Sequence, residues 1–263
     1  MHSPPAVYRY VLLAGVAFGA GLLNAVAGGG SFFSFPALLG IGLPPVNANA
    51  TNSVAIWPGQ ITSILAFRRE LHATRRLFLP AMAAAGAGGA IGAITLLLTS
   101  QSVFLRLVPW LLLLATALFA LSGPAQRRLQ HSRSLRQKPL GRPEGFSPGL
   151  FLSLAVVSFY IGYFGAGSGF LIITVLSLAG FSDLNEINAL KVLCNTAANG
   201  VAVAMFIVAR AVFWNECLVM LLFAAAGGYF GGMYSRRLNQ RLLRAIIIAT
   251  GALLSVFYFW KTT

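Results

Sequence analysis

The sequence predicts an all-α protein that crosses a membrane several times and is built from two inverted repeats. The first observation is the composition, because 57% of the 263 residues are hydrophobic, only 9% are charged, and the mean hydropathy is +0.79. The second is a series of apolar runs near the roughly 20 residues that a helix needs to cross the hydrocarbon. The third is a set of motifs that occurs twice at nearly constant spacing, which indicates a duplicated architecture.

Three pairs of motifs carry this duplication, with an offset of 137 residues in the first pair and 139 in the other two. The pairs are Gly28-Gly29-Gly30-Ser31 with Gly165-Ala166-Gly167-Ser168, Asn49-Ala50-Thr51-Asn52 with Asn188-Ala189-Leu190-Lys191, and Gly88-Gly89-Ala90-Ile91-Gly92 with Gly227-Gly228-Tyr229-Phe230-Gly231. We therefore divide the chain into a first membrane repeat (1–122), a linker (123–148) and a second membrane repeat (149–263). The linker is rich in Arg, Gln, Ser and Pro and is expected to be a basic cytoplasmic connector.

Ten apolar segments, five in each half, predict about 8 to 10 membrane segments. In chain order they are 10–27, 31–43, 47–66, 77–98, 103–121, 149–164, 168–181, 187–208, 214–234 and 241–260. Segments 31–43 and 168–181 rise only about 20 Å, which is less than the roughly 30 Å of the hydrocarbon core. They therefore either cross as short helices or form re-entrant hairpins with their predecessors. The start of the chain imitates a signal peptide, but its equivalent at 149–164 favours a retained helix.

The basic residues lie mainly in short loops between the apolar segments. Of the 19 Lys and Arg residues, four lie in 68–76, six in 127–142 and four in 236–244. This distribution follows the positive-inside rule, which places these loops in the cytoplasm and both termini outside. It also gives the two halves opposite orientations, because each contains an odd number of segments. The net charge of +14 therefore does not indicate a nucleic-acid partner.

Each glycine-rich motif precedes one of the two short segments. A helix is interrupted inside a membrane only where its free backbone groups face protein or a water-filled cavity, and glycine permits the turn. Ser31 and Ser168 are expected at the N-cap, where the helix start offers free N–H groups and a positive dipole end to an anion. Two such ends meeting near the midplane would bind a small anion. The alternative is that these glycines only permit close helix packing, to which we assign the later clusters at 88–92 and 227–232.

A polar stripe supplies further candidates for the site. In the second half its members are Asn188, Lys191, Asn195 and Asn199. Their counterparts in the first half are Asn49, Asn52, Ile56 and Gln60. Spacings of three, four and four place each set on one helix face, which is expected to point into the bundle. Amides donate N–H groups to an oxyanion without adding charge. Lys191 either supplies the counter-charge or snorkels to the interface beside Asp183 or Glu186.

Several chemistries are absent from the sequence. The five acids, none deep in a predicted span, are Glu70, Glu144, Asp183, Glu186 and Glu216. No carboxylate relay is therefore expected, and anion export can run on the membrane potential. The three histidines fall in the terminus or loops, so no base activates Ser168, and no catalytic residue is assigned. No P-loop or ligand cluster indicates a cofactor or metal, and Cys194 and Cys217 are interpreted as packing residues.

Some of these residues also match a known family pattern. Gly28-Gly29-Gly30-Ser31 with Pro36 and Leu38, and then Ala50-Thr51-Asn52-Ser53, resembles the first-half pattern of the sulfite exporter TauE/SafE family. The chain also resembles the second-half pattern of that family, at Gly162, Gly165 and Gly167-Ser168, and then at Lys191, Asn195 and Asn199. The resemblance covers about 8–260. It implies a bacterial inner-membrane permease, for export or uptake, of small sulfur-containing or organic anions such as sulfite or sulfonates.

The two halves differ chemically within this resemblance, since Ile173 replaces an equivalent of Pro36 and Leu190-Lys191 replaces Thr51-Asn52. Taken together, these observations predict a secondary transporter whose partners are a small anionic substrate and the lipid bilayer. The substrate-binding candidates are Gly28, Gly29, Gly30, Ser31, Asn52, Gly165, Gly167, Ser168, Lys191, Asn195 and Asn199. A transporter of a different small solute, an anion channel without alternating access and a membrane scaffold remain the alternatives. The sequence leaves open which anion is carried, the direction and coupling of transport, and the oligomeric state.

Overall fold

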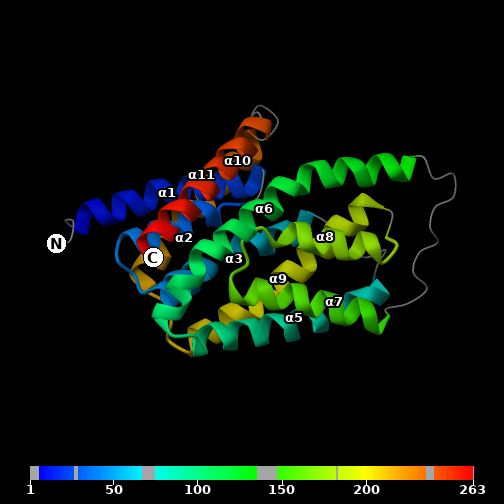
Figure 1. The fold of residues 1–263 in the computed structure, drawn as a ribbon, viewed down its shortest axis with the longest axis horizontal. Helices are drawn as coiled ribbons and strands as arrows, with labels where there is room; N and C mark the ends of the chain where they lie inside the picture. The colour runs from blue at the N-terminus through cyan, green and yellow to red at the C-terminus, as the bar shows by residue number, and fades with distance from the viewer. Residues whose placement is uncertain are drawn as a thin grey trace. The chain divides into compact units, whose positions relative to one another are not determined.

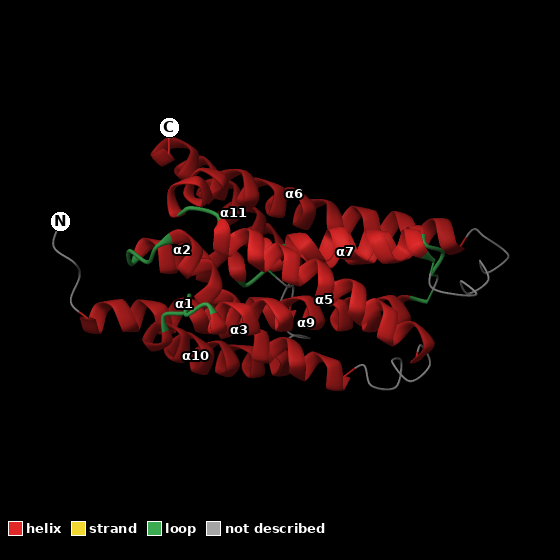
Figure 2. Cartoon of the chain, turned by 90° about the horizontal axis from the view of Figure 1, so that it is seen from below, coloured by secondary structure: helices red, strands yellow, loops and turns green. Residues whose placement is uncertain are grey.

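The computed structural model describes residues 6–26, 29–66, 75–134, 147–181, 183–234 and 240–262. All regular secondary structure within these ranges is helical, which confirms the all-α class for this part of the chain (Figures 1 and 2). The helices are α1 (Ala6–Val26), α2 (Ser31–Gly40), α3 (Pro45–Ala66), α5 (Arg75–Leu98), α6 (Gln101–Ser134), α7 (Pro148–Tyr163), α8 (Ser168–Leu178), α9 (Leu184–Val208), α10 (Trp214–Tyr234) and α11 (Gln240–Thr262). Each of the ten predicted apolar segments overlaps one of these helices.

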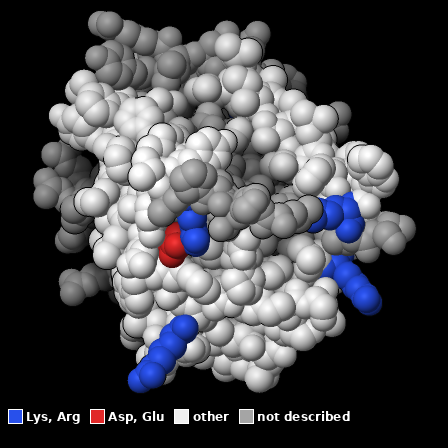
Figure 3. Space-filling view, turned by 90° about the vertical axis from the view of Figure 1, so that its left-hand side faces the viewer, with Lys and Arg blue, Asp and Glu red and all other residues white. Residues whose placement is uncertain are grey.

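Five of the described helices are long and apolar enough to cross a membrane. Their spans are Val7–Asn24, Leu77–Leu98, Gln101–Ser122, Asn185–Val208 and Leu242–Lys261. Large apolar side chains such as Leu79 and Trp260 are exposed, and on the face drawn in Figure 3 charged side chains are few among uncharged ones. An apolar surface of this kind suits contact with lipid. Helix α6 continues to Ser134, so the first part of the segment expected to be the linker is helical.

The contacts within the chain divide it into two compact units. Unit 1 comprises Met1–Gly59, Leu96–Thr116 and Phe206–Thr263, and unit 2 comprises Gln60–Thr95 and Ala117–Met205. Each unit therefore draws on both halves of the sequence. Helices α10 and α11, from the second half, belong to the unit that contains α1 and α2, whereas α5, from the first half, belongs to the unit that contains α7 and α8.

Unit 1 is held together by close packing of α1 on α10 and by a core around α2. A Cβ added at Gly227 would overlap the Phe18 backbone, so the two helices touch where a side chain is missing. Helix α1 also packs on α2, and α11 packs on α2. The Phe35 ring in α2 is buried and meets the Phe104 ring of α6 edge to face, with centroids 6.4 Å apart.

Unit 2 shows the same kind of helix contact between α5 and α7. A Cβ added at Gly88 would overlap the Ala155 backbone, and one added at Gly92 would overlap that of Phe159. The assignment of these glycine clusters to helix packing is therefore confirmed at Gly88, Gly92 and Gly227. The unit's apolar core combines α5, α7, α8 and α9, and it includes the buried Cys194.

Candidate functional site

The turn before α8 depends on two glycines with left-handed backbone conformations. Gly165 has φ +79° and Gly167 has φ +73°, which residues with a Cβ rarely adopt. Gly167 is the N-cap of α8 and Ser168 is the first helical residue, without a side-chain capping bond. The expectation that Ser168 caps this helix is therefore wrong. The left-handed turn needs glycine at the capping position, which moves the serine one place into the helix.

The start of α2 departs from expectation in the same way. Its N-cap is Gly30, in the helical region at φ −54° and ψ −33°, and no side chain caps it. Ser31 is therefore not the N-cap either. Gly29 has φ +94° and lies against the Ile247 side chain of α11. Gly28, the remaining residue of this predicted motif, lies outside the described residues.

The loop between α7 and α8 is tied to α7 at two points. The Tyr160 hydroxyl donates a 2.7 Å hydrogen bond to the Ala166 carbonyl, and the Gly165 amide donates one of 2.9 Å to the Tyr160 carbonyl. Ala166 is also buried, at 3% exposure. These contacts fix where α8 begins, and with it the position of the Ser168 side chain.

The Ser168 hydroxyl reaches across to α9. It lies 3.1 Å from Asn195 Oδ1, to which it donates, and Ser168 is only 4% exposed. Asn195 accepts this bond through its side-chain oxygen. Its amide nitrogen has no hydrogen-bond partner among the described residues. A buried polar contact of this kind holds both side chains in one orientation. The structure thus brings together two of the predicted site residues.

Lys191 lies one helical turn before Asn195 and beside the start of α8. Its Nζ donates a 3.2 Å hydrogen bond to Asn188 Oδ1, and its Cδ lies 3.5 Å from where a Cβ on Gly169 would be. Within the described part of the chain, Lys191 forms no ion pair with Asp183 or Glu186. Asp183 Oδ1 instead accepts from the backbone amide of Asn185 at 2.8 Å, at the start of α9.

Asn199 lies further along α9 and bonds elsewhere. Its Nδ2 donates a 3.1 Å hydrogen bond to Gln60 Oε1 near the end of α3. The Thr196 hydroxyl lies 3.4 Å from the Gln60 carbonyl. The predicted stripe is therefore buried or half-buried along its length, but no hydrogen bond among the described residues joins Asn199 to Ser168, Lys191 or Asn195.

Unit 1 contains a second serine–asparagine pair that the sequence did not single out. The Ser34 hydroxyl donates to Asn52 Oδ1 at 2.5 Å, and these side chains are 0% and 2% exposed. Ser31 has no side-chain hydrogen bond among the described residues. The available signal was helical periodicity, because Ser34 follows Ser31 by about one turn on the same face.

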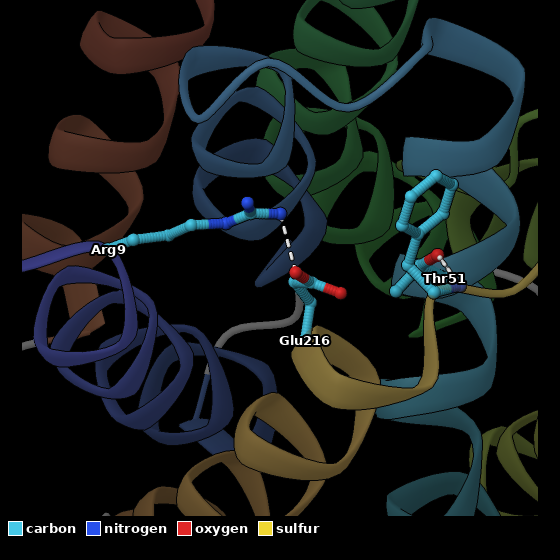
Figure 4. Close-up of polar contacts among 4 residues, drawn as sticks. Arg9, Thr51 and Glu216 are labelled. Atoms are coloured by element: carbon cyan, nitrogen blue, oxygen red, sulfur yellow. Dashed lines mark hydrogen bonds and ion pairs between the residues drawn. The ribbon is translucent and has the colours of Figure 1, made fainter. Parts of the chain in front are cut away.

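Long-range polar contacts at the start of α10 were also missed. Figure 4 shows Arg9 of α1 reaching toward Glu216, with Arg9 Nη2 and Glu216 Oε1 2.5 Å apart. In the same view, Thr51 of α3 accepts a 3.0 Å hydrogen bond from the Phe213 amide. Periodicity cannot pair residues 207 positions apart, so only the fold reveals the ion pair.

The cluster at the start of α8 is suited to an oxyanion. Asn195 offers its amide N–H groups and Lys191 an ammonium group, and both can donate hydrogen bonds to a ligand. The Ser168 hydroxyl holds Asn195 in place through the bond that it donates. A bond from a charged donor to an anion is about twice as strong as one between neutral groups. In the described ranges, no three His, Cys, Asp or Glu side chains are grouped to hold a metal ion.

Comparisons with known proteins match most of this chain. A family model described as "Sulfite exporter TauE/SafE" matches residues 13–258. The chain is 28% identical to "Probable membrane transporter protein ORF9" of Sinorhizobium sp. over 91% of its length and 88% of that protein. It is 28% identical to "Probable membrane transporter protein YfcA" of Escherichia coli strain K12, over 91% and 86% of the two chains. No solved structure matches the chain.

Proposed function

This chain belongs to the sulfite exporter TauE/SafE family, and we propose that its substrate is a small oxyanion, either sulfite or a sulfonate. It is a membrane transporter of that family, and it has five described helices able to cross a bilayer. We place it in the bacterial inner membrane with both termini outside, because the basic loops are then cytoplasmic. As a secondary transporter it exports the anion, which leaves a negative cell interior with a gain of about 2.3 kcal/mol per charge per 100 mV.

The observation that carries this proposal is the contact between Ser168 and Asn195 beside Lys191. The three side chains come from α8 and α9. Ser168 donates to Asn195 and Lys191 donates to Asn188, while the amide nitrogen of Asn195 can still donate to a ligand. Polar side chains within a membrane span are costly, and those that are present mark substrate paths in many transporters. Gly165 and Gly167 give the turn that allows α8 to start at this place.

An inverted repeat is the architecture that we propose around this site. Its support is a contact that occurs twice at equivalent positions of the two halves. Gly88 lies against Ala155 in unit 2, and Gly227 lies against Phe18 in unit 1. The two glycines are 139 positions apart and their partners are 137 apart, the same offsets as in the repeated motifs. Repeats of this kind let one bundle rock against another around a fixed site.

The test is efflux of radiolabelled sulfite from proteoliposomes that contain the purified protein. Asn195→Leu removes the amide from the cluster and should abolish flux without affecting membrane insertion. Asn185→Leu is the matched control, because its exposed side chain lies at the start of the same helix. Unchanged flux in Asn195→Leu would remove this residue from the substrate site.

The kinetics of the same assay separate the other candidate functions. A carrier saturates as the substrate concentration rises, and unlabelled sulfonates compete with the labelled anion. An anion channel shows flux that follows the imposed potential without saturation in the same range. A transporter of a different small solute shows no sulfite flux but is revealed by another labelled compound. Folded protein with no flux of any solute would favour a scaffold.

A further inference from the structure

One cationic side chain stands alone among the neutral donors of the cluster at the start of α8. Lys191 is the only lysine or arginine of unit 2 whose side chain the structure describes. It lies within the candidate span Asn185–Val208, and its carbon chain runs beside Gly169. Its hydrogen-bond partner, Asn188, is neutral. The positive charge of Lys191 is therefore not cancelled by a carboxylate among its described contacts.

The other donors around Lys191 bring dipoles but no further positive charge. Ser168 is buried, and its hydroxyl is engaged with Asn195. One fixed cation neutralises one negative charge on a bound ligand. A second charge would remain uncompensated in a low-dielectric interior, where an unpaired ion is strongly disfavoured. Glu186, a buried acid five positions before Lys191 on the same helix, forms no ion pair with Lys191 among the described residues.

We infer that this cluster selects oxyanions that carry a single negative charge, with Lys191 as the residue that sets the charge. The inference rests on the proposed function and narrows its substrate class. Sulfonates meet this requirement, and sulfite meets it in its monoprotonated form. Sulfate is a dianion of similar size with the same type of oxygen atoms, so it is the rejected analogue. Hydrogen bonds to the amide of Asn195 orient the bound group in either case, and the number of charges decides affinity.

Methanesulfonate and sulfate provide the direct comparison. Efflux of labelled methanesulfonate from proteoliposomes is measured with each unlabelled anion as competitor, at constant ionic strength. The thermal midpoint of the purified protein is recorded with the same two anions. We expect methanesulfonate to compete at a concentration about tenfold or more below that of sulfate, and to raise the midpoint at concentrations where sulfate does not.

Variants of Lys191 test whether this residue causes the preference. Lys191→Gln should weaken competition by methanesulfonate about tenfold or more, because a charge-assisted contact is lost. Lys191→Arg keeps the charge and should keep the preference for methanesulfonate over sulfate. Lys261→Gln removes an exposed charge at the end of α11 and should behave like the wild type. This pattern separates a role in charge selection from a general loss of folding.

The possible results separate failure of the inference from failure of the proposed function. Equal competition by sulfate and methanesulfonate would overturn the inference while leaving an anion transporter. Retention of the preference in folded Lys191→Gln would also overturn it. Absence of both flux and thermal stabilisation with either anion, in folded wild-type protein, would overturn the proposed function and the inference together.

Discussion

Asn199 of α9 donates a 3.1 Å hydrogen bond to the side-chain oxygen of Gln60 in α3. The two residues are 139 positions apart, the offset that relates the repeated motifs of the two halves. The contact therefore joins two residues that the sequence predicts to be equivalent in the two repeats.

Breaking the pair from one side should cost stability. Gln60→Leu leaves the Asn199 amide in a largely buried site without its partner, at an expected cost of about 1–3 kcal/mol. Asn199→Leu should have a similar effect, and the double variant should be more stable than the sum of the two losses predicts, with a coupling of about 0.5–3 kcal/mol. Thermal unfolding of the purified variants measures the cycle.

Transport by the same variants decides whether Asn199 also binds substrate, as the sequence predicts. If Asn199 acts only through Gln60, the double variant regains the flux that either single variant loses. Persistent loss of flux in the folded double variant would instead indicate direct contact between Asn199 and the anion.

The repeated glycine contacts predict a matched set of stability changes. Gly88→Ala and Gly227→Ala each force a methyl group into a backbone carbonyl of the neighbouring helix, and each should lose about 1–3 kcal/mol. Gly86→Ala and Gly228→Ala are controls on the same helices, because a Cβ there meets its nearest atom at 3.5 and 3.9 Å. Thermal midpoints that fall equally in all four variants would contradict the proposed close contacts.

Removing one partner of the ion pair between Arg9 and Glu216 should destabilise the protein more than removing both. Arg9→Met leaves a carboxylate that is 7% exposed without its counter-ion. The expected loss lies somewhat below the about 3–5 kcal/mol of fully buried pairs, because the Arg9 side chain is 30% exposed. Replacing both residues by Met should recover most of that loss. Arg106→Met, which removes an exposed charge in the same unit, is the control for thermal unfolding.

The turn before α8 gives a prediction about function as well as stability. Gly167→Ala places a methyl group on a residue with φ +73°, at a cost of about 1–2 kcal/mol, and shifts Ser168 relative to Asn195. Gly42→Ala also places a Cβ on a residue with positive φ, at +91°, with open space around it, and Gly42 belongs to the other unit. Both variants should lose stability, but only Gly167→Ala should raise the substrate concentration needed for half-maximal flux. Equal transport by the two variants would dissociate the turn from binding.

The sequence predicted the class of fold well because its strongest signals are local. Runs such as 77–98 and 187–208 are apolar over the length of a membrane span, and helices α5 and α9 overlap them closely. A turn before α8 was likewise predicted from its glycines, and Gly165 and Gly167 both have positive φ there. In contrast, the division of the chain into units depends on contacts far apart in sequence, such as the packing of α1 on α10.

The candidate site could be predicted from the sequence only in part, for the same reason. Helical spacing placed Lys191, Asn195 and Asn199 on one face of α9, but it could not say which neighbour each one meets. Ser168 was expected to cap its helix and instead bonds to Asn195. Ser34 was not predicted, because the glycine motif directly precedes Ser31 and Ser34 lies one turn later in the helix. Partners of polar side chains are set by the packing of helices, which periodicity does not encode.

The packing of α1 against α10 also determines when unit 1 can be completed during synthesis. About 190 residues separate the end of α1 from the start of its partner. At about 5–20 residues per second, the ribosome needs about 10–40 s to produce them. During that interval the α1 surface around Gly21, shaped to receive the α10 backbone, must face lipid or the insertion machinery. Unit 1 is thus completed only at the end of synthesis, so a chain stopped before α10 leaves its first helix without the partner that covers it.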